Sequence, residues 1–341
     1  MKTDIKSMTV AELEQLLGNI GEKKYRAIQI FRWISGGVCE FDEMTNLPKD
    51  LREKLKEFAF IERLEKQKLQ ISAKDGTRKY LFRLRSGNAI ESVFLKYNYG
   101  NSVCISSQAG CRMGCSFCAS AIGGTCENLS PAEMLDQIMS IRKDTDEPIG
   151  NAVIMGTGEP FDNYANLCRF LELVHAKEGM NMSFRAITVS TCGIIPKIRD
   201  FGKAFPQVNL AVSLHAPNDE IRSRLMPVNK KYPMEELLKA CRKYTRDTGR
   251  RISFEYALIN GVNDNRSHAE MLAGKLRGML CYVNLIPLNP VREREYAAGD
   301  RQSAVTFHRI LTKNGVETTI RRELGTDIDG ACGQLRLQKI N

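Results

Sequence analysis

The chain has 341 residues, 43% of them hydrophobic, and its 50 Lys and Arg exceed its 40 Asp and Glu, which gives a formal charge of +10. This length accommodates one large α/β domain with a small accessory domain, and no apolar run approaches the length of a transmembrane helix. The polar N-terminus lacks the apolar centre of a secretory signal, so we expect a cytoplasmic protein without a membrane partner. The charge favours a phosphate-rich partner, although a merely soluble basic protein has the same composition.

Residues 1–60 are predicted to form a helical accessory domain. A capping box at Thr9 and Glu12 begins a first helix, which Gly18 is expected to end. Apolar residues at helical spacing within 27–34 predict a second helix, and a third is expected near Pro48. We interpret this charge-dense segment as an RNA-binding domain, with a solvated helical cap as the alternative. Its candidate contact residues are Lys23, Lys24, Arg26 and Arg32.

Residues 61–96 change from a helical to a strand pattern. The runs 79–84 and 90–94 are rich in β-branched and aromatic residues and flank the turn sequence Ser-Gly-Asn at 86–88. We expect a β-hairpin that connects the accessory domain to the rest of the chain.

Residues 97–341 alternate between short strands and helices. A helix with Pro at its first position follows the capping box of Ser130 and Glu133. Such alternation predicts a parallel sheet, and six β/α units are too few for a closed eight-stranded barrel. We therefore expect an open, partial (β/α)6 barrel followed by one more strand at 316–320. The six barrel strands are predicted at 103–106, 152–155, 186–190, 209–214, 253–258 and 282–286.

Three of the eleven cysteines stand within eight residues, as Cys111, Cys115 and Cys118. An odd number of cysteines in a cytosolic chain disfavours a disulfide scaffold and indicates metal or redox chemistry. The spacing C-x3-C-x2-C, just after the first barrel strand, suits three irons of a 4Fe–4S cluster and leaves the fourth iron open. The alternative is a zinc site with Cys104 or Cys126 as fourth ligand, but the second C-x2-C half typical of zinc sites is missing. The segment resembles the radical S-adenosylmethionine superfamily.

Further polar candidates follow the predicted strands, where barrel enzymes build their active sites. The glycines of the sequence Gly-Thr-Gly-Glu-Pro at 156–160 are expected to let the backbone approach a ligand. Glu159 is a candidate acceptor for the amino group of S-adenosylmethionine. For His215 a buried structural histidine remains the alternative. The other candidates at strand ends are Ser190, Ser213, Leu214 and Asn289.

Three motifs together resemble one family over nearly the whole chain: Cys-Ile-Ser-Ser-Gln-Ala-Gly-Cys at 104–111, Gly-Thr-Gly-Glu-Pro at 156–160 and Gly-Ala-Cys-Gly-Gln-Leu at 330–335. The chain resembles the dual-specificity rRNA/tRNA adenine-C2 methyltransferases, which modify adenosine 2503 of 23S rRNA and adenosine 37 of some tRNAs. Two small departures, Thr157 and Gly330, replace no reacting group. The resemblance implies rRNA and tRNA as partners, and an electron donor such as flavodoxin or ferredoxin.

The resemblance also implies the role of each site residue. Cys111, Cys115 and Cys118 would hold one 4Fe–4S cluster per chain. Cys332 would carry the methyl group and Cys104 would resolve the adduct by forming a disulfide. Glu91 would accept the C2 proton. Two molecules of S-adenosylmethionine would be consumed per methylation, and the residues implied in binding it are Gly158, Glu159, Ser190, Ser213, Leu214, His215 and Asn289.

Adenine C2 is electron-poor and cannot attack a methyl sulfonium as an amine does, so a radical route is expected. Three alternatives stay open on the sequence. A relative that methylates C8 of the same adenosine would share the cluster and both reacting cysteines. A radical enzyme acting on a small molecule, or a non-catalytic RNA-binding iron–sulfur or zinc protein, fits the basic charge and the paired Cys104 and Cys332 less well.

Overall fold

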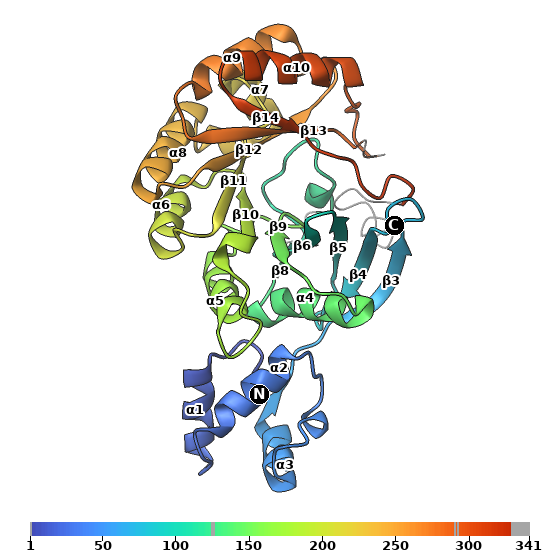
Figure 1. Ribbon diagram of the computed structural model, residues 1–341, viewed down its shortest axis with the longest axis vertical. Helices are drawn as coiled ribbons and strands as arrows, with labels where there is room; N and C mark the ends of the chain where they lie inside the picture. Colours follow the sequence, from blue (N-terminus) through green and yellow to red (C-terminus); the bar gives the residue numbers. More distant parts are fainter. Residues whose placement is uncertain (1, 124–126, 290, 292, 329–341) are drawn as a thin grey trace.

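The computed structural model describes residues 2–123, 127–289, 291 and 293–328. Its N-terminal part forms three helices, α1 (Val10–Asn19), α2 (Arg26–Ser35) and α3 (Lys49–Phe58), as expected (Figure 1). The short strands β1 (Thr3–Asp4) and β2 (Ala59–Phe60) pair in parallel and bring the two ends of this unit together. The first helix continues through Gly18, and it is Gly21, with φ +76°, that adopts the left-handed conformation after it.

A single ten-stranded sheet forms the rest of the scaffold, in the order β14-β13-β12-β11-β10-β9-β6-β5-β4-β3. The predicted hairpin is part of this sheet: β3 (Glu65–Ile71), β4 (Arg78–Arg83) and β5 (Ala89–Tyr97) extend it with antiparallel pairing. From β6 onward the pairing is parallel, which confirms the open six-stranded barrel and the additional strand. The parallel strands are β6 (Gly100–Ile105), β9 (Asn151–Ile154), β10 (Ile187–Thr191), β11 (Asn209–Ser213), β12 (Ile252–Leu258), β13 (Cys281–Pro287) and β14 (Glu317–Ile320).

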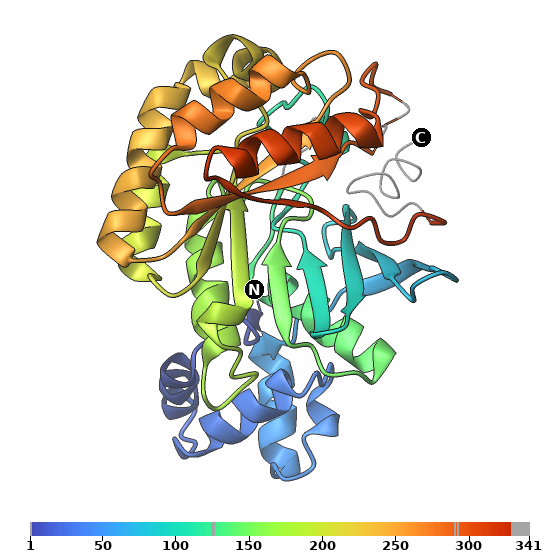
Figure 2. The ribbon, with the colours of Figure 1, turned by 45° about the horizontal axis from the view of Figure 1, so that its top comes forward.

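Helices cover the outer face of the curved sheet, and in Figure 2 the yellow-to-red helices lie outside it. Strand alternation decides which side chains meet them. Val103 and Ile105 of β6 belong to the main hydrophobic core, whereas Cys104 between them faces the inner side. These helices are α4 (Pro131–Thr145), α5 (Tyr164–His175), α6 (Ile195–Ala204), α8 (Met234–Thr248), α9 (Arg266–Leu276) and α10 (Arg301–Lys313). The short helix α7 (Asp219–Leu225) lies instead at the C-terminal ends of β10 and β11. A small two-stranded ladder, β7 (Gln108–Ala109) with β8 (Glu127–Asn128), lies beyond the end of β6.

The N-terminal unit is joined to the barrel through α4. Lys6 forms a buried ion pair with Asp136 at 2.5 Å, and the other Asp136 carboxylate oxygen accepts from the Leu64 backbone N–H at 2.7 Å. Arg142 donates to the Ser35 carbonyl at 2.9 Å. Because apolar side chains of the helical unit and the barrel belong to one continuous core, the two parts fold against each other.

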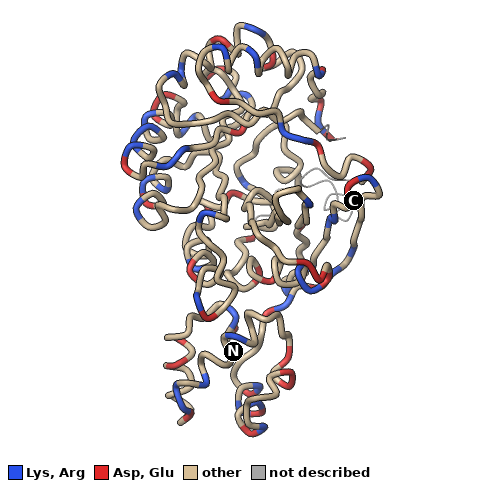
Figure 3. The backbone as a smooth tube through the Cα atoms, viewed as in Figure 1, with Lys and Arg blue, Asp and Glu red and all other residues tan. Residues whose placement is uncertain are grey.

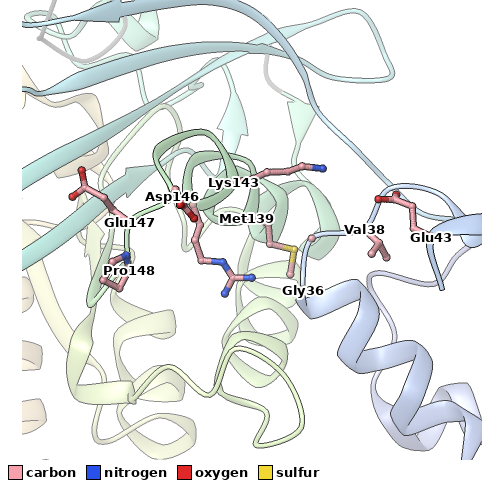
Figure 4. Close-up of a pocket in the computed structure, with 10 residues that line it drawn as sticks. Gly36, Val38, Glu43, Met139, Lys143, Asp146, Glu147 and Pro148 are labelled. Atoms are coloured by element: carbon pink, nitrogen blue, oxygen red, sulfur yellow. The ribbon is translucent and has the colours of Figure 1, made fainter. Parts of the chain in front are cut away.

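A cavity of about 430 Å³ lies at this junction, between residues 36–43 and the second half of α4 (Figure 4). Glu147 and Pro148, which line it, lie on the short connection that leads into β9. The cavity is therefore at the N-terminal end of the parallel strands, the end where barrel proteins place stabilising contacts rather than catalytic groups.

Basic and acidic residues are interspersed along the backbone (Figure 3). Residues 1–60 contain ten basic and ten acidic side chains, so their net formal charge is zero and the whole excess of +10 belongs to the rest of the chain. In the ranges that the structure describes, no helix combines the length and apolar character required to cross a membrane.

Candidate active site

The cysteine loop, residues 111–118, lies at the C-terminal end of the sheet and is fixed to α7. The Ser116 backbone N–H donates to the Leu225 carbonyl at 2.9 Å, and Met113, Cys115 and Phe117 pack against an apolar cluster that contains Leu225. Burial raises the pKa of the Cys115 thiol, and the neighbouring Cys118 and Cys111 raise it further. The structure thus brings the three predicted ligands together in one partly buried loop.

The donor set of this loop fits a 4Fe–4S cluster, because three thiolates from one short segment can each bind a different iron of the cube. A zinc site would need a fourth ligand from elsewhere in the chain. Cys126, the other candidate zinc ligand, lies outside the described residues.

The loop 156–160 packs so closely against residues 105–108 that there is no room for a side chain at either of its two glycines. A Cβ on Gly156 would lie 2.7 Å from the Ile105 carbonyl oxygen, and one on Gly158 would lie 2.6 Å from the Gln108 Cβ. Gly158 also has φ +110°, which side chains rarely adopt. From the sequence alone, close approach of the backbone to a ligand explains these glycines. The structure shows a further reason: the loop lies directly against the segment that leads into the cysteine loop.

Glu159 is fully buried and already holds three donors. Its Oε1 accepts from the Thr191 hydroxyl at 2.7 Å and from the Phe161 N–H at 2.9 Å, and its Oε2 accepts from the Cys192 N–H at 2.7 Å. Burial raises the pKa of this carboxyl, and the same hydrogen bonds oppose the rise. Oε1 has two donors, and the Cys192 thiol is a further hydrogen-bond partner of this carboxyl, so Glu159 is largely occupied by contacts within the fold. Glu159 also joins the ends of β9 and β10.

Two buried hydroxyls beside this loop have no hydrogen-bond partner, Ser107 Oγ and Thr157 Oγ1. Buried hydroxyls without partners are uncommon and call for an explanation. They fit a polar ligand at the C-terminal end of β6 and β9, as S-adenosylmethionine would be. Sequence reasoning missed both residues as binding groups, because a hydroxyl two or three residues after a strand has no distinctive spacing.

His215 follows β11 in the left-handed conformation, with φ +54°. Its Nδ1 accepts from the Ala257 N–H at 2.9 Å, which places the proton of the neutral ring on Nε2. Burial lowers the pKa of His215 to about 3, and the cation of Arg222 lowers it further. The ring meets Phe117 of the cysteine loop edge-on, with centroids 5.0 Å apart. His215 is thus a buried histidine whose Nδ1 has a hydrogen-bond partner, and its ring also packs against the cysteine loop.

The remaining predicted contacts lie at the same edge of the sheet. Ser190 and Ser213 are partly exposed near the ends of β10 and β11, and Leu214 is buried with its N–H donating to the Glu255 carbonyl at 3.0 Å. Asn289 is exposed in the loop after β13. Their common position follows from parallel strands, whose carboxyl ends meet at one edge.

Glu91 and Cys104 share the inner face of neighbouring strands. Val93 pairs with Cys104 across β5 and β6, and Glu91 stands two residues before Val93 on β5. Both side chains are buried, and Glu91 forms an ion pair with Lys79 of β4 at 3.0 Å. Sequence reasoning missed Lys79, since the pairing depends on strand register.

Cys104 lies in a small apolar cluster with Val93 and Leu95, and Leu324 of the C-terminal segment packs on the same cluster. All nine cysteines in the part of the chain that the structure describes are free thiols, and none forms a disulfide. Cys332 lies outside the described residues, so its disulfide with Cys104 stays a prediction.

Comparisons with known proteins cover both parts of the chain. The Radical SAM superfamily model matches residues 105–272, and the "Ribosomal RNA large subunit methyltransferase N-terminal domain" model matches residues 3–61. A protein of Lachnospira eligens named "Probable dual-specificity RNA methyltransferase RlmN" is 53% identical over 98% of this chain and 96% of its own length. A protein of the same name from Thermoanaerobacter sp. is 52% identical over 98% of this chain and 97% of its own.

A solved structure agrees with these relatives. The crystal structure of a radical SAM methyltransferase from Sphaerobacter thermophilus is 44% identical, covers 97% of this chain and 98% of its own, and superposes with a TM-score of 0.93. The family models, the relatives that match nearly the whole chain and the solved structure all indicate the same family. The chain belongs to the RlmN family of radical SAM RNA methyltransferases.

Proposed function

We propose that the chain methylates C2 of adenosine 2503 in 23S rRNA and C2 of adenosine 37 in tRNAs. The observation that carries this proposal is the shared inner face of Glu91 and Cys104, beside the edge where the cysteine loop lies. A buried carboxylate and a buried thiol on adjacent strands suit a reaction that ends with a proton transfer and a thiol attack. A displacement on a nucleophilic nitrogen would need neither group.

Each residue then has a distinct task. When bound through Cys111, Cys115 and Cys118, the cluster together with S-adenosylmethionine supplies the methyl group and the radical that an aromatic C–H requires. Cys332 carries the methyl group to the base, and Glu91 accepts the C2 proton. Cys104 attacks the Cys332 sulfur and forms a Cys104–Cys332 disulfide. The electron pair of the broken sulfur–carbon bond stays on the carbon attached to the base, which takes up a proton to complete the methyl group.

The contacts of residues 324–327 support this proposal. Asp327 accepts from the Ser72 hydroxyl at 2.6 Å and from the Ala73 N–H at 2.8 Å, and the Gly325 N–H donates to Asp75 at 2.8 Å. We call this attachment of residues 324–327 to the β3–β4 turn the C-terminal clasp. Cys332 follows this attachment five positions after Asp327 in the sequence.

The turn between α1 and α2 supports RNA binding by the N-terminal unit. Lys23, Lys24 and Tyr25 are exposed there, and the Arg26 guanidinium lies 4.8 Å from the centre of the Tyr25 ring. Cations beside an exposed aromatic ring suit a phosphate chain with unstacked bases. In this proposal a flavodoxin- or ferredoxin-like donor reduces the cluster in the cytoplasm.

The decisive test separates the two reacting cysteines. Cys332→Ala should form neither methylated protein nor a covalent RNA complex. Cys104→Ala should accept the methyl group and add to RNA but remain bound to it, which a denaturing gel with labelled RNA detects. Cys168→Ala, a partly buried thiol on α5, is the control and should turn over normally.

A Cys104→Ala protein that turns over, or a Cys332→Ala protein that methylates RNA, would contradict the mechanism. Mass spectrometry of nucleosides from the methylated rRNA and tRNA reports the ring position. Methylation at C8 in place of C2 would overturn the regiochemistry while leaving the roles of both cysteines intact.

A further inference from the structure

Arg222 on α7 is the largest side chain that the structure buries completely, with 0% exposure. Its Nη1 donates to Asn229 Oδ1 at 2.8 Å, and its Nη2 donates to the Cys192 carbonyl at 2.7 Å and to the Ser213 carbonyl at 3.2 Å. The Nε–H has no hydrogen-bond partner. The guanidinium is thus fixed between the ends of β10 and β11, with its Nε–H still available.

No carboxylate forms an ion pair with this cation in the part of the chain that the structure describes. Asp219 acts on Arg222 electrostatically but forms no ion pair with it; its Oδ1 accepts from Asn229 Nδ2 at 2.8 Å, and Asn229 Oδ1 accepts from Arg222. A buried charge is unfavourable unless an opposite charge and hydrogen bonds compensate for it. The carbonyls satisfy some of the donors, but they do not neutralise the charge.

The cysteine loop lies directly against the helix that carries Arg222. Leu225, one turn further along α7, accepts from the Ser116 N–H through its carbonyl, and Cys115 packs on the same apolar cluster as Leu225. Arg222 is close enough to act electrostatically on Cys115. A Cβ on Gly193 would lie 3.4 Å from Arg222 Nη2, so the surrounding chain is closely packed around the guanidinium.

We propose that Arg222 is the buried counter-cation of the iron–sulfur cluster and raises its reduction potential. The thiolates that hold the cluster bring negative charge to the loop, and reduction adds one more negative charge. A fixed cation nearby stabilises the reduced form more than the oxidised form, since net charge and nearby hydrogen bonds set cluster potentials. The inference rests on the proposed cluster ligands Cys111, Cys115 and Cys118 and is independent of the RNA substrate.

The test compares Arg222→Gln with Arg222→Lys in anaerobically reconstituted protein without S-adenosylmethionine. Both replacements keep a donor for the carbonyls, but only Lys keeps the charge. At the wild-type midpoint potential, we expect the ratio of reduced to oxidised cluster in Arg222→Gln to fall about tenfold, equivalent to about 59 mV for one electron. Arg222→Lys should stay much closer to the wild type. Arg224→Met, an exposed arginine on the same helix, should leave the ratio unchanged.

A second measurement remains decisive if Arg222→Gln is unstable. Assembly of the cluster should raise the thermal midpoint of the wild type more than that of Arg222→Gln, because only the wild type gains compensation for its buried cation. Equal gains, or equal potentials with full iron content in both proteins, would overturn the inference. So would a variant whose affinity for S-adenosylmethionine falls while its potential is unchanged, since this would assign the cation to the cofactor's carboxylate. Absence of iron in the wild type would instead refute the cluster ligands.

Discussion

His215 combines a left-handed backbone with a ring that burial keeps neutral. Its pKa of about 3 in the folded protein is below the value near 6.5 of an unfolded chain, so the unfolded chain binds more protons between these values. The stability that this group contributes is complete above about pH 6.5. It is lost as the pH falls toward 3, at about 1.4 kcal/mol per pH unit.

His215→Asn should therefore flatten the acid side of the stability curve. Asn tolerates positive φ and can present an oxygen to the Ala257 N–H in place of Nδ1, but it does not titrate. Urea unfolding at pH 7 and pH 5 measures the effect, and the wild type should lose about 2 kcal/mol more than the variant between these pH values. Equal losses would show that this ring is not held neutral.

The Lys79–Glu91 pair should behave as a coupled unit. Removing one partner of a buried ion pair leaves an uncompensated charge, so Lys79→Met should destabilise the fold by about 3–5 kcal/mol. Adding Glu91→Gln to that variant should recover much of the loss, which a double-mutant cycle from urea titrations quantifies. Lys243→Met breaks an exposed pair with Asp247 on α8 and should change stability little. Additive losses at residues 79 and 91 would argue against the coupling.

At the residue scale, sequence spacing predicts the cysteine loop because all three thiols come from one short segment. Lys79 and Arg222 could not be predicted in the same way. Lys79 meets Glu91 only because β4 and β5 pair in one register, and Arg222 meets strand ends that are far from it in sequence. The hydrogen-bond donors to Glu159 likewise come together only in the fold. The sequence therefore predicts that Glu159 is an acceptor, but it does not show that groups of the protein already donate to this carboxylate.

At the scale of elements, the C-terminal clasp attaches the end of the described chain to the β3–β4 turn. Burial raises the pKa of Asp75, but hydrogen bonds from the backbone N–H groups of Gly325 and Thr77 outweigh it and lower the pKa to about 2. Asp327→Ala removes the two bonds to Ser72 and Ala73. We expect faster limited proteolysis after residue 320 and slower RNA methylation, because a freed segment presents Cys332 less often.

The cluster should be unaffected by Asp327→Ala, so its iron content and absorption spectrum provide the internal control. Asp247→Ala, an exposed carboxylate on α8, is the matched variant and should alter neither proteolysis nor methylation. Normal methylation despite a released C-terminal segment would mean that the clasp does not position Cys332.

Most elements follow from periodicity, but β3 does not. Its sequence, Glu-Lys-Gln-Lys-Leu-Gln-Ile, lacks clear alternation because this edge strand is largely exposed on both faces. Lys66 and Lys68 suit such an edge, since charged side chains discourage pairing with another chain. The predicted two-stranded hairpin is therefore three strands of the main sheet, an outcome that tertiary pairing decides.

At the scale of the whole molecule, the N-terminal unit is part of the common core, so deleting it would not be a clean test of RNA binding. Deletion of residues 1–60 would remove Lys6 and leave Asp136 buried without its cation. Point changes in the α1–α2 turn avoid this, because Lys23 and Lys24 are exposed.

Lys23→Ala with Lys24→Ala should weaken RNA binding while preserving the fold. Each lost phosphate contact lowers the slope of log affinity against log salt by about 0.7–0.9, so the double variant should lose about 1.5. Binding titrations at several salt concentrations measure this slope. The control removes Lys239 and Lys243 from the exposed side of α8, and an equal loss in both proteins would indicate general charge rather than a specific RNA-binding surface.

The strand order of the main sheet has a consequence for how the chain is made. From β3 to β14 each strand of that sheet pairs only with the strand synthesised before it and the one synthesised after it. No early strand must wait for a partner from the far end of the polypeptide. The sheet can consequently grow in one direction as the nascent chain leaves the ribosome, and stalled chains ending after β12 should already protect β4 to β11 from protease.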